Sequence, residues 1–322
     1  MTPILKVTGL TKHFPVAKKS LFGQHETVQA VDDVSFEIGA GEAVGLVGES
    51  GCGKSTTGRL ITRLIDPTAG SIEFDGQDIS KLDGKELLPI RPKLQMIFQD
   101  PYASLNPRHT VGTIVSTPMK INGIKPEGGT KKAVQELLEI VGLNPEHYNR
   151  YPHEFSGGQR QRIGIARALA LRPKLIVADE PVSALDVSIQ AQIINLMKDL
   201  QKDFGLAFVF VAHDLAVVRH FAQRVAVMYL GKIVEISDRD TLYSNPRHPY
   251  TKALLSAIPE ADPDASGSRE RIQLTGDVPN PINPPSGCRF RTRCWKAQEI
   301  CASATPSLKL VGNSTVACHF PE

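Results

Sequence analysis

The chain has 322 residues, of which 41% are hydrophobic and 22% charged, a composition typical of a soluble globular protein with one large domain and an appendage. Its 37 Lys and Arg residues against 34 Asp and Glu residues leave a net charge of +3, too small to favour nucleic acid as a partner. No stretch has the length and apolarity of a membrane span, and the first residues lack the pattern of a secretory signal. We therefore expect a cytosolic chain, in which structural disulfides are rare.

A glycine-rich turn follows an apolar strand predicted at Ala43–Val47 and leads into a helix. The turn has the P-loop pattern G-x4-G-K-S, whose backbone N–H groups bind phosphate oxygens. Its lysine, Lys54, would reach the terminal phosphates, and the Ser55 hydroxyl would coordinate Mg²⁺. This pattern is shared by kinases, GTPases and motors. The expected nucleotide contacts are Gly48, Glu49, Ser50, Gly51, Cys52, Gly53, Lys54, Ser55 and Thr56, with Cys52 contributing only its backbone.

Two helices are predicted between this loop and the middle of the chain. Lys131–Gly142 has apolar residues at helical spacing. Glu154–Leu171 (EFSGGQRQRIGIARALAL) begins with a good N-cap, Ser156, followed by Gly157 and Gly158, which leave backbone N–H groups accessible. That helix start is either a second anion-binding site or an ordinary capped helix with a glycine-rich entry.

The segment Lys174–Pro181 (KLIVADEP) is predicted to be a buried parallel strand that ends in two carboxylates. Together with a P-loop, Asp179 would hold the Mg²⁺ water shell, and Glu180 would polarise the water that attacks the γ-phosphate. Without a P-loop, the same acidic pair would be a solvated turn. Farther on we expect an amphipathic helix at Ser188–Leu200 and a β-hairpin at Arg224–Ile236.

The order of P-loop, SGGQR and ADEP resembles the ABC ATPase family, and SGGQR resembles its signature. The resemblance implies that two ATPase units pair head to tail, with each ATP held between one unit's P-loop and the other's signature residues. The second anion-binding helix start then has a function. The signature contacts to the partner's ATP would be Ser156, Gly157, Gly158 and Gln159.

The same resemblance assigns four further elements. Gln99 is similar to the Q-loop glutamine, a contact to Mg²⁺ and water where a membrane partner docks. His213 is similar to the switch histidine that contacts the γ-phosphate, and Phe14 to the aromatic residue that stacks on adenine. The D-loop at the dimer interface would comprise Ser183, Ala184, Leu185 and Asp186.

The implied fold is an α/β P-loop NTPase core over residues 1–258, with a mixed sheet around the P-loop strand. An antiparallel N-terminal portion would comprise Leu5 to Ile38 and Ser71 to Asp75. A helical subdomain at about residues 100–171 would carry the signature.

The composition changes after Ser237. A helix is predicted after Pro249, a polar linker at residues 261–270 and a proline-rich extended segment at residues 276–285. RHPYTKALLSAIP and PNPINPPSGCRFRTRC resemble the C-terminal region of oligopeptide/dipeptide transporter ATPases, which makes residues 259–322 an extension of that type.

This second resemblance implies an ATPase that energises import of di- or oligopeptides from the cytoplasmic face of the inner membrane, as a peripheral subunit. The implied partners are a second, related ATPase in a heterodimer, two membrane permeases and an extracytoplasmic binding protein, with no nucleic acid. Import of another small solute, such as nickel, is an alternative. A soluble ABC ATPase of nucleic-acid or ribosome metabolism is a second alternative, although such proteins usually carry two cassettes or a long coiled coil. A P-loop small-molecule kinase would leave SGGQR without a function.

Four of the five cysteines, Cys288, Cys294, Cys301 and Cys318, lie in this extension. Four thiolates suit either zinc or an iron–sulfur cluster, and their spacing does not choose between them. The family resemblance favours a [4Fe–4S] cluster, with zinc as the alternative. Arg289, Arg291 and Arg293 lie between the first cysteines, where they would offset the charge of a cluster or form a solvated basic face.

Overall fold

The structure is a computed structural model that describes residues 2–16, 26–258 and 271–322. The linker predicted at residues 261–270 lies outside the described residues. The chain divides into two compact units, each assembled from separate stretches of sequence. The first unit comprises Met1–Ile4, Gly39–Glu42 and Lys81–Val211, and the second comprises Leu5–Ile38, Ala43–Ser80 and Ala212–Glu322.

Three parallel strands form the sheet of the first unit, in the order β6 (Leu94–Ile97), β7 (Leu175–Asp179) and β8 (Ala207–Ala212). Every residue of β7 and β8 is buried. Strands buried on both faces need continuous apolar runs, and the sequence LIVA had predicted β7 for that reason. A 3₁₀ turn at Arg91–Lys93 leads into β6.

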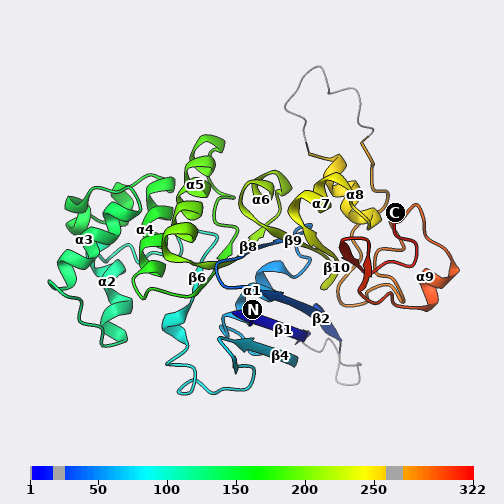
Figure 1. Ribbon diagram of the computed structural model, residues 1–322, viewed down its shortest axis with the longest axis horizontal. Coiled ribbons are helices and arrows are strands. Elements are labelled where there is room, and N and C mark those ends of the chain that lie inside the picture. The colour runs from blue at the N-terminus through cyan, green and yellow to red at the C-terminus, as the bar shows by residue number, and fades with distance from the viewer. Residues whose placement is uncertain (1, 17–25, 259–270) are drawn as a thin grey trace. The chain divides into compact units, whose positions relative to one another are not determined.

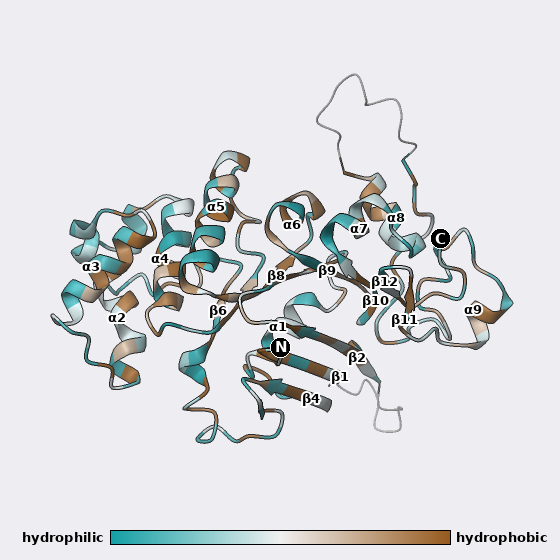
Figure 2. Cartoon of the chain, in the orientation of Figure 1, coloured by the Kyte–Doolittle hydropathy of each residue, from teal (hydrophilic) through white to brown (hydrophobic). Residues whose placement is uncertain are grey.

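Helices make up the rest of the first unit. The helices α2 (Val111–Ile121), α3 (Thr130–Ile140) and α4 (Gly157–Leu169) contact one another, and α5 (Val187–Phe204) contacts α4 (Figure 1). Helix α3 confirms the predicted amphipathic pattern, because its apolar residues gather on one side (Figure 2) and its fully buried ones are four positions apart. The 3₁₀ turns at Pro145–Asn149 and Pro152–Glu154 precede α4.

The second unit contains an antiparallel sheet, as predicted for the N-terminal portion. Its strand order is β2-β1-β4-β5, and Figure 1 shows β2, β1 and β4 side by side. Long strands β1 and β2 pair along most of their length. Their sequence alternates only partly between apolar and polar residues, because bulges interrupt the register of β1. The strands are β1 (Leu5–Pro15), β2 (Thr27–Ile38), β4 (Ala69–Phe74) and β5 (Gln77–Asp78).

A mixed sheet in the second unit carries the P-loop. Strand β3 (Ala43–Val47) pairs in parallel with β9 (Arg224–Tyr229), and β9 forms the predicted hairpin with β10 (Lys232–Asp238). The P-loop connects β3 to α1 (Lys54–Ile61). The remaining helices of this unit are α6 (Leu215–Phe221), α7 (Arg239–Ser244), α8 (Pro249–Ser256) and α9 (Glu299–Ser303).

The C-terminal residues complete this second unit. Strand β12 (Ser314–Val316) pairs with β10, and β11 (Lys309–Val311) pairs with β12, all antiparallel. Phe290 is only 1% exposed and contacts the rings of Tyr229 and Tyr250. The end of the chain therefore folds onto the β9–β10 hairpin and α8. Within the described residues, no helix is both long and apolar enough to cross a membrane.

Candidate nucleotide-binding site

The P-loop depends on glycine for steric reasons. Gly48 and Gly53 have φ angles of 150° and 105°, which residues with a side chain rarely adopt. A Cβ atom on Gly48 would lie 2.2 Å from the Met228 carbonyl oxygen, and one on Gly53 would lie 2.1 Å from that of Ala30. The loop thus follows the backbone of β2 and β9 so closely that the glycine spacing is a packing requirement as well as a phosphate-binding pattern.

The side chain of the P-loop lysine is hydrogen-bonded to the backbone of its own loop. The Lys54 side chain is almost fully buried, and its Nζ donates hydrogen bonds to the carbonyl oxygens of Gly48 and Glu49 at 2.8 and 2.9 Å. Burial raises the pKa of the neighbouring Cys52 thiol, so this thiol stays neutral. That Cys52 contributes only its backbone to nucleotide binding stays a prediction. In this geometry the lysine ammonium contacts two carbonyl oxygens of its own loop.

The carboxylate pair lies in the first unit, at the end of β7. Asp179 is 2% exposed, while Glu180 is half-buried and has a φ of 44°. A glutamate in this left-handed region is strained, and such strain is concentrated at functional positions. The Glu180 carboxylate accepts a hydrogen bond of 2.9 Å from the side-chain amide of Gln99. Two residues that sequence reasoning assigned to one reaction therefore meet in the structure.

The signature segment starts α4 with a reciprocal capping box. The Ser156 hydroxyl accepts from the Gln159 N–H at 3.3 Å, and the Gln159 side chain accepts from the Ser156 N–H at 3.0 Å. The predicted N-cap is confirmed. A Cβ on Gly158 would lie 2.4 Å from the Ile189 Cγ2 of α5, so this glycine also permits close helix packing.

The D-loop lies beside the signature in the first unit. A Cβ on Gly157 would be 3.4 Å from the Leu185 side chain. The Ser183 hydroxyl donates to the Glu180 carbonyl oxygen at 3.1 Å, and Asp186 is the N-cap position of α5. Ala184, between them, is exposed. The structure therefore groups Gln99, Asp179, Glu180, the signature and the D-loop in one unit.

The remaining predicted contacts, Phe14 and His213, belong to the second unit together with the P-loop. Phe14, on β1, is 36% exposed and lies 5.2 Å from the Lys12 ammonium, measured to its ring centre. His213 is exposed at the start of α6, whose N-cap is Asp214. An exposed aromatic ring on β1 is available for stacking against a flat ligand.

All five cysteines are free thiols. Burial, together with the nearby thiols of Cys318, Cys301 and Cys294, raises the pKa of Cys288 to about 11, so the four tail cysteines are electrostatic neighbours. The Cys288 N–H also donates to the Cys301 carbonyl oxygen at 2.8 Å. However, no group of three or more His, Cys, Asp or Glu side chains in the described part of the chain is arranged to hold a metal ion. The four thiols are gathered, but they do not converge as the ligands of a single ion.

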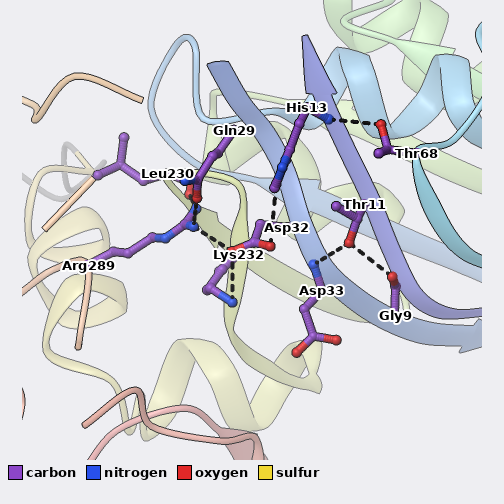
Figure 3. A network of polar contacts seen from close by, with 10 residues as sticks. All are labelled: Gly9, Thr11, His13, Gln29, Asp32, Asp33, Thr68, Leu230, Lys232 and Arg289. Atoms are coloured by element: carbon purple, nitrogen blue, oxygen red, sulfur yellow. Dashed lines mark hydrogen bonds and ion pairs between the residues drawn. The ribbon is translucent and has the colours of Figure 1, made fainter. Parts of the chain in front are cut away.

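Two of the arginines between these cysteines have carboxylate partners that the sequence did not indicate. Arg289 is 8% exposed and donates to Gln29, to Asp32 and to the carbonyl oxygen of Leu230 (Figure 3). Burial by itself would raise the pKa of Asp32, but the nearby cations of Lys232 and Arg289 outweigh burial and lower this pKa. Arg289 therefore links the cysteine segment, residues 288–301, to β2 and to the β9–β10 turn.

Arg293 reaches the P-loop itself. Its guanidinium donates two hydrogen bonds, of 2.7 and 3.1 Å, to the two carboxylate oxygens of Glu49. The hydroxyl of Tyr250 accepts a hydrogen bond of 2.9 Å from the Glu49 N–H. A solvated basic face is therefore the wrong interpretation for Arg289 and Arg293, since both side chains are about nine-tenths buried. No spacing rule in the sequence links positions this far apart.

The fold and these sites define a P-loop ATPase of the ABC type, and residues 31–183 match the family model described as ABC transporter. Residues 234–301 match the family described as the C-terminal region of oligopeptide/dipeptide transporters. The chain belongs to the family of ATP-binding proteins of oligopeptide/dipeptide ABC transporters.

Two relatives are similar over almost their whole length. The oligopeptide transport ATP-binding protein AppF of Bacillus subtilis is 54% identical, with 98% of this chain and 97% of the relative covered. The dipeptide transport ATP-binding protein DppF of Haemophilus influenzae is 52% identical, with 96% and 93% covered. Among solved structures, the dimeric post-hydrolysis state of the ATP-binding cassette MJ0796 with ADP and phosphate has a TM-score of 0.65 at 32% identity, covering 73% of this chain and 98% of that one.

Proposed function

We propose that this chain is the ATP-hydrolysing subunit that energises import of di- and oligopeptides through a membrane ABC transporter. The observation that carries the proposal is the match of residues 234–301 to the oligopeptide/dipeptide transporter C-terminal region, which lies beyond the ABC match. The names of AppF and DppF support the same cargo class. In this proposal residues 1–258 are the ATPase domain, with a helical subdomain at about residues 100–171, and residues 259–322 are the extension.

Nucleotide binding would use the P-loop and β1. The backbone N–H groups of the loop bind the phosphates, and the Lys54 ammonium moves from its loop carbonyls to the terminal phosphates. Phe14 stacks on the adenine. When Mg²⁺ is bound it neutralises phosphate charge, and the oxygen donors of Ser55, Gln99 and Asp179 are of the kind that Mg²⁺ prefers.

Hydrolysis would use the Gln99–Glu180 pair. The Glu180 carboxylate accepts a proton from the attacking water, and the amide of Gln99 holds that carboxylate in position. His213 contacts the γ-phosphate. The strained backbone of Glu180 fixes its side-chain direction at the end of β7.

A second ATPase subunit would complete each site. Residues Ser156–Gln159 bind the ATP on the partner's P-loop, and residues Ser183–Asp186 lie at the interface. We propose that the partner is a related chain in a heterodimer, attached at the cytoplasmic face of the inner membrane to two permeases that dock near Gln99. An extracytoplasmic binding protein delivers the peptide. ATP must favour the closed dimer by several kcal/mol to switch the assembly decisively.

We also propose that Cys288, Cys294, Cys301 and Cys318 bind a [4Fe–4S] cluster, with zinc as the alternative. Support comes from four free, neighbouring thiols and from the preference of thiolates for soft metals. Because no ligand group for an ion is assembled among the described residues, the thiols would have to converge on binding. Anaerobically purified protein should be brown and should lose its colour in Cys294→Ser. Colourless protein with one zinc per chain would favour zinc, and metal-free protein would overturn the site.

The transport proposal is tested in proteoliposomes that contain this chain, its ATPase partner, the permeases and the binding protein. Uptake of a labelled dipeptide should require MgATP and should be lost in Lys54→Ala. Arg91→Ala, in the 3₁₀ turn before β6, is the matched control, because it removes one cation outside the proposed contacts. Uptake that continues without this chain would overturn the proposal, and uptake of another solute with no peptide transport would overturn the cargo.

A further inference from the structure

One residue of the P-loop, Glu49, is held by two separate parts of the C-terminal region. Arg293, from the cysteine segment, forms a two-pronged ion pair with its carboxylate, at 2.7 and 3.1 Å. Tyr250, from α8, accepts a hydrogen bond from its backbone N–H at 2.9 Å. Both the side chain and the backbone of Glu49 are therefore fixed by residues outside the ABC match.

The charge of Glu49 makes this contact relevant to the nucleotide. Glu49 is the first residue after Gly48 in a loop whose N–H groups point at phosphates. A free carboxylate at this place would repel the phosphates, because like charges in a partly desolvated loop interact strongly. The bidentate arginine neutralises that charge and restricts rotation of the carboxylate.

The cysteine segment is anchored firmly enough to hold the arginine in place. Phe290, three residues before Arg293, contacts the rings of Tyr229, Tyr250 and His248 with centroid distances of 5.2 to 5.7 Å. Arg289 binds Asp32 and the Leu230 carbonyl oxygen (Figure 3). The Arg293 side chain is itself only 8% exposed. A long side chain held in one geometry loses little entropy on pairing, which favours a persistent ion pair.

We propose that Arg293 is a positioning residue of the ATP site: by pairing with the Glu49 carboxylate it removes a negative charge that would repel the phosphates on the P-loop. In this proposal the C-terminal extension contributes a residue that supports nucleotide binding at the P-loop. This inference rests on the proposed ATP site, and the experiment separates the two. A wild-type chain that does not bind MgADP would refute the site itself, whereas unchanged binding in the variants below would refute only the inference.

The experiment measures MgADP affinity of the purified full chain by equilibrium dialysis, which avoids hydrolysis. Arg293→Gln should weaken binding about tenfold, because the Glu49 carboxylate is left unpaired. The double variant Glu49→Gln/Arg293→Gln should restore wild-type affinity, since it removes both charges. The defect of Arg293→Gln should shrink as salt is raised, because ions screen the repulsion. In the assembled complex, Arg293→Gln should raise the KM for ATP and leave kcat nearly unchanged.

Arg291→Ala is the matched control, because Arg291 lies in the same segment and donates to Ser286 of its own loop. It should bind MgADP like the wild type. Equal losses of MgADP affinity in Arg293→Gln and in the double variant would show a purely structural effect and overturn the proposal. Wild-type affinity in Arg293→Gln would overturn it as well. If Arg293→Gln does not fold, Glu49→Gln decides the question: it should bind MgADP at least as tightly as the wild type, and weaker binding would refute the proposal.

Discussion

His248 makes the stability of the C-terminal region dependent on pH. Its ring is buried, and its Nδ1 accepts a hydrogen bond of 3.1 Å from the Tyr250 N–H at the start of α8. Burial lowers the pKa of His248 to about 3, because the site offers no solvent to the imidazolium. The unfolded chain binds this proton near pH 6.5. We therefore expect the second unit to lose stability as the pH falls from about 6.5 towards 3.

The magnitude follows from proton linkage. Below the unfolded pKa, each pH unit costs about 1.4 kcal/mol of unfolding free energy, because only the unfolded state binds the proton. Between about pH 7.5 and about pH 5.5 the expected loss is about 1.4 kcal/mol. Glu235, whose carboxylate accepts a hydrogen bond from the backbone N–H of His248, contributes with the opposite sign, since burial raises the pKa of its carboxyl. A comparison of two proteins that share Glu235 removes its contribution.

His248→Asn provides that comparison. The asparagine side-chain oxygen can still accept the Tyr250 N–H as an N-cap, but it does not titrate. Urea unfolding of both proteins is followed at the two pH values through Trp295, the single tryptophan, which lies in the same unit. The wild type should lose about 1.4 kcal/mol more than the variant between the two pH values. Equal pH dependence in the two proteins would refute a buried, neutral His248.

The remaining predictions concern the ATP site. Glu180→Gln should keep nucleotide binding but cut turnover by roughly 10²- to 10⁴-fold, the range of a general base, and wild-type turnover measured by phosphate release would exclude Glu180 from that function. Gly158→Ala should lower the melting temperature of the chain, because its methyl carbon would lie 2.4 Å from Ile189 Cγ2; an unchanged melting curve would mean that α4 and α5 separate at little cost. The isolated chain should be a poor ATPase whose activity rises on addition of the second ATPase and the permeases, and full, non-cooperative activity of a monomer in light scattering would contradict the shared site.

Where neighbouring residues decide the structure, the sequence was sufficient. The P-loop, the strands β3 and β7, the β9–β10 hairpin and the start of α4 depend on short patterns of glycine, apolar runs and capping residues. Each pattern acts within a few residues, because backbone torsion, hydrogen bonding and periodicity are local properties. The ATP contacts of the P-loop follow from the same short pattern and remain predictions of function.

Contacts between distant segments required the tertiary structure. Glu49 and Arg293 are 244 positions apart, and the sequence showed Arg293 only as one of three arginines among cysteines. The left-handed backbone of Glu180 also had no signal, because glutamate has no preference for that conformation and the surrounding strands impose it. A charged side chain in a sequence specifies what it can bind, but the fold decides which opposite charge comes within reach. For this chain the sequence determined that there is a phosphate-binding loop, and the packing of Phe290 and Arg289 decided that the C-terminal extension holds it.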